Sequence, residues 1–118
     1  MARLLFVFRH GPHGSARARE GLDAALAALA FDHGVDALFL GEGALSLKPG
    51  HDTGAAGMKD FAPGFGALPR HGLHRAVASR AALDALGLAP EGLTLRVEVL
   101  SEPALGDFIA EHDAILAF

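Results

Sequence analysis

The chain has 118 residues, of which 51% are hydrophobic and 20% charged, and its formal net charge is −4. This length and composition predict one domain over residues 1–118 with a hydrophobic core, and they exclude intrinsic disorder. The acidic balance argues against direct nucleic-acid binding, and no apolar run approaches the ~20 residues of a membrane span. We therefore expect a cytoplasmic protein. The chain contains no cysteine, which excludes thiol chemistry and disulfides.

The first forty residues predict a strand, a helix and a second strand. Residues 4–8 are a continuous apolar run, which is typical of a strand buried on both faces of a parallel sheet. Ser15 is the predicted N-cap of a helix over residues 16–30, where apolar side chains recur at helical spacing. Residues 35–40 follow Gly34 and predict a second strand. This order predicts a right-handed βαβ unit.

Residues 41–66 hold seven of the fifteen glycines, and a segment of this kind is either a functional loop or contains short helices. Large apolar side chains within it could form an exposed patch for a partner, or they could fold back over the core. Lys59 could form an ion pair across such an interface or be solvated. The candidate partner-interface residues are Met58, Lys59, Phe61 and Phe65.

The second half predicts three further strands and two helices. Residues 73–78 form a third strand candidate, and Ser79 is the predicted N-cap of a short helix that ends at Gly87. Residues 93–99 alternate between apolar and polar side chains, which favours a strand near the sheet edge.

Ser101 is the predicted N-cap of the last helix, and residues 114–118 form a last apolar strand. The inward face of that helix is expected to carry Leu105, Phe108 and Ile109. The regular alternation of strand and helix predicts an α/β fold, a three-layer α/β/α domain with a mainly parallel sheet of about five strands.

The loop after the first strand is a candidate anion site, because it leads into a helix N-terminus at the carboxyl end of a strand. The alternative is a turn shaped by Gly11, Pro12 and Gly14, with solvated polar side chains. The candidate ligand-binding residues in this loop are Arg9, His10, His13 and Ser15.

The segment Arg9-His10-Gly11 also resembles the start of the histidine phosphatase superfamily, in which the histidine is a nucleophile. That superfamily needs a second active-site histidine, typically in a Gly-His pair after a later strand. The Gly50-His51 pair of this chain lies instead in the glycine-rich segment. An enzyme that uses His10 is therefore the weakest of three hypotheses.

The seven histidines do not predict a metal site. His10 and His13 are three residues apart, as are His71 and His74, but neither pair has an evident third ligand. We take His33, His51 and His112 as isolated. The loop after the first strand also lacks the glycine pattern of a dinucleotide site, so we expect no metal and no cofactor.

Three ordered stretches resemble the DsrE/DsrF-like sulfur-relay family, most closely its DsrF/TusC-type subunit. The first is PHGS at residues 12–15 with REGLDA at residues 19–24. The second comprises residues 38–43, 50–53 and 57–61, and the third is the terminal HDAILAF at residues 112–118. The resemblance extends over nearly the whole chain, as expected of a single DsrE/DsrF-like domain.

The resemblance implies a heterohexamer with two copies each of three homologous subunits, which passes sulfur as persulfide to a small sulfur-carrier protein. The expected partners are sister subunits of the DsrE/TusD and DsrH/TusB types. The sulfur is used for 2-thiouridine in tRNA or for sulfur oxidation, and residues 57–61 slightly favour the second use.

In the family, the principal persulfide cysteine belongs to the DsrE/TusD-type subunit, near the end of the third strand. The corresponding place here is residues 78–80, and the hydroxyl of Ser79 cannot form a persulfide. We therefore predict a non-catalytic subunit of a sulfurtransferase complex, with no catalytic residue of its own. The competing hypothesis is a stand-alone homo-oligomeric domain that binds a small anion at residues 9–15.

Overall fold

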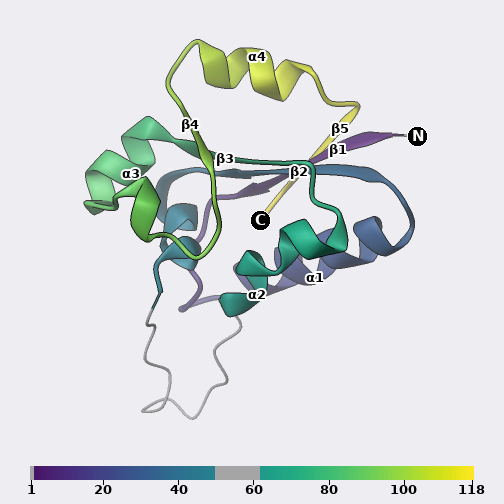
Figure 1. Ribbon diagram of the computed structural model, residues 1–118, viewed down its shortest axis with the longest axis horizontal. Coiled ribbons are helices and arrows are strands. Elements are labelled where there is room, and N and C mark those ends of the chain that lie inside the picture. Colours follow the sequence, from purple (N-terminus) through teal and green to yellow (C-terminus); the bar gives the residue numbers. More distant parts are fainter. Residues whose placement is uncertain (1, 50–61) are drawn as a thin grey trace.

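A computed structural model describes residues 2–49 and 62–118, and its centre is a five-stranded sheet (Figure 1). Every pair of neighbouring strands is parallel, and the order across the sheet is β4-β3-β2-β1-β5. The α/β fold with a parallel sheet of five strands is therefore confirmed. The strands are β1 (Arg3–Phe8), β2 (Gly34–Phe39), β3 (Arg75–Ser79), β4 (Glu98–Leu100) and β5 (Ala114–Ala117).

Helices lie on both sides of the sheet and complete the three layers. Figure 1 shows α4 on one side of the sheet, with α1 and α2 on the other. Within the described residues, no helix has the length and hydropathy needed to cross a membrane. The helices are α1 (Arg17–Ala30), α2 (Pro63–Gly66), α3 (Arg80–Leu86) and α4 (Ala104–Ala110).

The two faces of the sheet are covered unequally. On the α1 side, a large core includes stacked and edge-on phenylalanine rings, with Phe8 and Phe39 5.1 Å apart between ring centres. On the α4 side, a smaller cluster joins four strand residues to Leu105 and Phe108 of α4. Because α4 has only seven residues, its apolar contacts with the sheet are few, and polar contacts matter for its position.

Two of the three predicted serine N-caps are wrong. Helix α1 begins at Arg17 with Ala16 as N-cap, and the Ser15 hydroxyl oxygen accepts a long 3.4 Å hydrogen bond from the Arg17 amide. Helix α4 has Pro103 as N-cap, since Glu102 and Pro103 extend the turn beyond Ser101. In both places the chain needs additional turn residues before the helix begins, and these separate the serine from the cap position.

The prediction for α3 is confirmed at both ends. Ser79 Oγ accepts a hydrogen bond from the Ala82 amide at 3.1 Å, which satisfies one of the free N–H groups of the first turn. Gly87 ends the helix with φ of 66°, a left-handed conformation that glycine adopts without steric cost.

The strand predicted over residues 93–99 is mostly wrong, since β4 pairs with β3 only over Glu98–Leu100. The preceding residues pack against the 3₁₀ segment Gly41–Leu47, where the Thr94 amide donates to the Leu47 carbonyl oxygen at 2.8 Å. Leu95 is buried there. The apolar alternation therefore reflects loop packing, while the predicted edge position of the strand is confirmed.

The 3₁₀ segment packs closely against the end of β1 at Gly43. A Cβ at Gly43 would collide with the backbone carbonyl of Phe8, which cannot move without disturbing the sheet. We expect Gly43→Ala to lower the free energy of unfolding by about 3 kcal/mol in urea denaturation. Gly92→Ala is the matched control, because a Cβ there meets nothing within 4 Å. Equal stabilities of the two variants would contradict this packing.

Candidate functional site

The loop after β1 lies at the carboxyl end of the sheet, where ligands bind in open α/β folds. The Arg9 amide donates to the Phe118 carbonyl oxygen at 2.7 Å, which ties the loop to the residue that follows β5. Arg9, His13 and Ser15 are exposed, and His10 is half-buried. The ring Nδ1 of His10 is buried and has no hydrogen-bond partner within residues 2–49 and 62–118. All four candidate residues thus lie on this loop, and anion binding there stays a prediction.

The phosphatase hypothesis needs a second histidine near His10, and two of the described histidines lie at the opposite end of the sheet. His74 and His112 both contact Asp36, near the start of β2, whereas His10 follows the end of β1. Because β1 and β2 are parallel and in register, these histidines are a strand length away from His10.

Two adjoining hollows lie beside α4 at the carboxyl end of the sheet. One has a volume of about 360 Å³ and is lined by Ser79, at the end of β3, and by Ser101, which follows β4. The other has a volume of about 470 Å³ and includes Leu40, which follows β2. Glu102 and Leu105 line both hollows, which we together call the α4 groove.

Ser79 lies within residues 78–80, where the family resemblance implies the persulfide cysteine of a sister subunit. Ser79 is 6% exposed and is the N-cap residue of α3, where its hydroxyl oxygen accepts a hydrogen bond from the Ala82 amide. The side chain therefore has a sufficient structural role in this chain.

The candidate partner-interface residues fall into two groups. Met58, Lys59 and Phe61 lie outside the described residues. Phe65 is fully buried in the core, edge-on to the rings of Phe8 and Phe39. For Phe65, the geometry corresponds to the alternative in which the segment folds back over the core.

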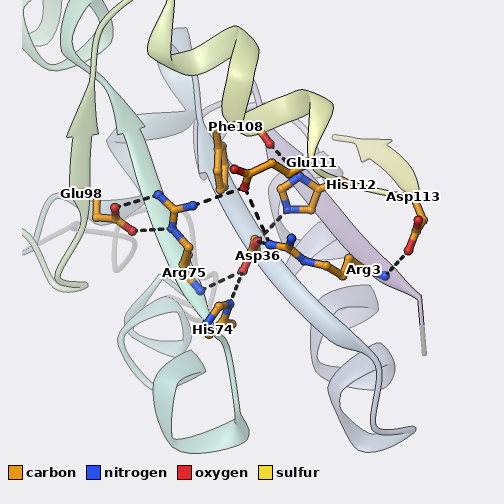
Figure 2. Close-up of polar contacts among 9 residues, drawn as sticks. All are labelled: Arg3, Asp36, His74, Arg75, Glu98, Phe108, Glu111, His112 and Asp113. Carbon is orange, nitrogen blue, oxygen red and sulfur yellow. Dashed lines mark hydrogen bonds and ion pairs between the residues drawn. The ribbon is translucent and has the colours of Figure 1, made fainter.

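The sequence patterns gave no sign of a polar cluster at the amino end of the sheet. Figure 2 shows its centre, the Asp36 carboxylate, which is 2% exposed although it lies within an otherwise apolar strand. Asp36 accepts from the Arg75 amide at 2.9 Å and from the Arg3 guanidinium at 3.3 Å. The His74 ring lies 3.6 Å away. The amino-end cluster comprises Arg3, Asp36, His74, Arg75, Glu98, Phe108, Glu111, His112 and Asp113.

His112 connects this cluster to α4. Its side chain is fully buried, with Nε2 2.7 Å from Asp36 Oδ2 and Nδ1 3.0 Å from the Phe108 carbonyl oxygen. A carbonyl oxygen only accepts, so Nδ1 donates to it, and an ionised Asp36 likewise accepts from Nε2. The cluster thereby fixes the C-terminal end of α4 to β2.

Arg75 extends the cluster to the sheet edge. Its guanidinium donates two 2.8 Å hydrogen bonds to Glu98 and lies over the Phe108 ring, 4.7 Å from the ring centre. The hydrogen bond to Glu98 raises the pKa of Arg75, and the same bond lowers the pKa of Glu98 below its ordinary value of 4.5. The ionised pair therefore persists throughout the neutral range.

The contacts of the cluster connect several elements of the fold. Within residues 2–49 and 62–118, no group of three or more His, Cys, Asp or Glu side chains is arranged to hold a metal ion. Its contacts join β1, β2, β3 and β4 to α4, so its effect is to hold the helix on the thinly covered face.

We predict that Asp36→Asn lowers the free energy of unfolding by about 3 kcal/mol, because it removes the buried carboxylate to which the Arg3 guanidinium, the Arg75 amide and the His112 ring bind. Urea denaturation at neutral pH measures this change. Glu98→Gln is the matched control, since the Glu98 side chain is 50% exposed and the loss of an exposed ion pair costs less than about 1 kcal/mol. A small effect of Asp36→Asn, equal to that of Glu98→Gln, would contradict the structural role of the buried pair.

This chain is similar to known proteins over nearly its whole length. It is 41% identical over 113 residues to a "Protein TusC homolog" of Pseudomonas aeruginosa, covering 96% of this chain and 95% of that protein. It is 31% identical to a "Protein TusC homolog" of Vibrio vulnificus over the full length of both chains. The crystal structure of the ychN protein from E. coli superposes on this chain over the full length of both proteins, with a TM-score of 0.79. The sequence identity is 17%, so the likeness is one of fold alone.

The sequence profile of the DsrE/DsrF-like family matches residues 2–118, nearly the whole chain. This match confirms the resemblance seen in the ordered motifs, and it agrees with the parallel five-stranded fold. The chain therefore belongs to the DsrE/DsrF-like family.

Proposed function

We propose that this chain is a non-catalytic subunit of a sulfur-relay complex in the cytoplasm. The observation that carries the proposal is the absence of cysteine from a member of this family. The resemblance implies that the persulfide cysteine of a sister subunit corresponds to residues 78–80, where this chain has Ser79. A hydroxyl group cannot accept sulfur as a persulfide, because the relay requires a thiolate nucleophile. The covalent chemistry would then belong to a sister subunit, and this chain would supply shape and contact surface.

The exposed apolar residues of the last strand support a role in assembly. Ile115 and Leu116 lie in β5 at the sheet edge and are 52% and 37% exposed, although both side chains are apolar. An apolar edge strand is an aggregation hazard unless another chain or element covers it. The partners we propose are subunits of the DsrE/TusD and DsrH/TusB types. Met58, Lys59 and Phe61 remain candidate contacts within this proposal.

We further propose that the complex serves 2-thiouridine synthesis in tRNA. The relatives with the highest identities reported above are named TusC homologs, and the resemblance connects the Tus-type subunits with tRNA thiolation. The slight preference for sulfur oxidation rested on residues 57–61, which lie outside the described residues. The identities to TusC homologs are the stronger argument, because they extend over the full chain.

A stand-alone anion-binding domain is the second candidate. The observation that favours it is the buried Nδ1 of His10, which has no hydrogen-bond partner among the described residues and lies on the loop that also carries Arg9 and His13. On this alternative the isolated chain would be a homo-oligomer, and the sister proteins would not co-purify with it.

The assembly proposal predicts that the chain, co-expressed with its two sister subunits, elutes as one complex in size-exclusion chromatography with mass detection. After incubation with a persulfide donor, intact-mass spectrometry is expected to find added sulfur on the DsrE/TusD-type subunit and none on this chain. The physical reason is that this chain has no thiol. The complex incubated without the donor is the control.

Elution of this chain alone, with both sister subunits left behind, would contradict the proposal and favour the anion-binding domain. Sulfate titration followed by NMR would then test residues 9–15 directly.

A further inference from the structure

The α4 groove combines an apolar floor with an acidic rim. In its larger hollow the floor is formed by Leu40, Leu105 and Ile109, of which Leu40 and Ile109 remain partly exposed. Glu102 and Asp107 are exposed at its margin, and none of the described residues that line this hollow is basic. The feature is therefore an apolar depression in a negative electrostatic environment.

The smaller hollow continues this charge pattern towards α3. Arg80 and Asp84 both line it and form an exposed ion pair at 3.7 Å, so the charge of Arg80 is offset within the groove. Glu102, which the two hollows share, adds a carboxylate without an ion-pair partner among the described residues. The acidic rim of the groove therefore complements positive charge on a ligand, and its apolar floor complements an apolar side chain of that ligand.

We propose that the α4 groove docks a transient protein partner, through a segment in which a large apolar side chain is flanked by lysine or arginine. The inference rests on the proposed function, because a subunit without a thiol contributes to a relay by bringing other proteins into position. The composition favours a transient partner over a permanent subunit. Permanent interfaces are the more hydrophobic class, whereas two exposed carboxylates at the margin of this groove attract a basic partner through charge.

The floor of the groove is preorganised by the amino-end cluster. Leu105 and Ile109 belong to α4, whose C-terminal end is fixed to β2 through His112 and Asp36. A surface that is already ordered loses little conformational freedom on binding, so even a small contact area can support recognition.

The test uses the full chain and a fluorescein-labelled peptide in which leucines alternate with lysines, with fluorescence anisotropy as the readout. We expect binding that weakens as salt is added. Glu102→Gln with Asp107→Asn is expected to weaken binding about tenfold, the effect of two exposed charge pairs. A control that removes the same charge elsewhere, Asp23→Asn with Glu91→Gln, is expected to bind as the parent chain does.

A second variant tests the apolar floor without touching the charges. Gly106 lines the larger hollow, and a Cβ added there meets nothing within 4 Å, so Gly106→Phe is expected to fill the hollow in a folded chain. This variant is expected to lose binding of the peptide. Equal binding by the parent, the groove variants and the charge control would overturn the proposal and leave only non-specific attraction to an acidic protein.

The assembled complex separates this inference from the proposed function. The peptide is expected to bind equally well when the chain is in complex with its sister subunits. Loss of binding upon assembly would assign the groove to a permanent subunit interface and overturn the transient partner. Failure of the subunits to assemble would count against the proposed function, while peptide binding to the isolated chain would still report on the groove.

Discussion

The buried carboxylate of Asp36 is the constraint around which the thinly covered face of the sheet is organised. An uncompensated charge in an apolar strand costs several kcal/mol, so Asp36 requires partners from every element around it. The amide of Arg75, the guanidinium of Arg3 and the ring of His112 meet that requirement. Because His112 lies two residues beyond the end of α4, satisfying Asp36 also fixes a seven-residue helix that has few apolar contacts of its own.

Fixing one end of α4 has consequences at its other end. Helix α4 contributes Leu105 and Ile109 to the floor of the α4 groove. The groove lies at the carboxyl end of the sheet, the region in which α/β proteins bind ligands. Ser79 lies in the same region, and its oxygen caps α3. In this chain the region therefore combines a defined surface with the absence of a thiol. Such a combination fits the proposed role of a subunit that positions other proteins.

The fold was predictable from the sequence because its signals are local. The apolar run of residues 4–8 and the Ser79–Gly87 helix signals each lie within a few residues, and the structure confirms them. Local signals misled where turn residues intervened, so that Ala16 and Pro103 replace Ser15 and Ser101 as N-caps.

The amino-end cluster was not predictable in the same way. Asp36 and His112 are 76 residues apart, and each appeared in the sequence as a single polar residue in an unrelated element. Only the pairing of β1 with both β2 and β5 brings them together. The α4 groove likewise depends on residues that follow three different strands. Sequence periodicity describes one element at a time and carries no information on such contacts.

The central claim is that this chain supports sulfur relay without a nucleophile, and Ser79→Ala tests it most directly. A strain that lacks the gene would be complemented with the parent or the variant chain, and 2-thiouridine in its tRNA would be measured by nucleoside mass spectrometry. The account predicts that deletion abolishes the modification and that both chains restore it, with the variant losing only about 1 kcal/mol of stability from its missing N-cap. A folded, assembled Ser79→Ala chain that fails to restore 2-thiouridine would contradict it.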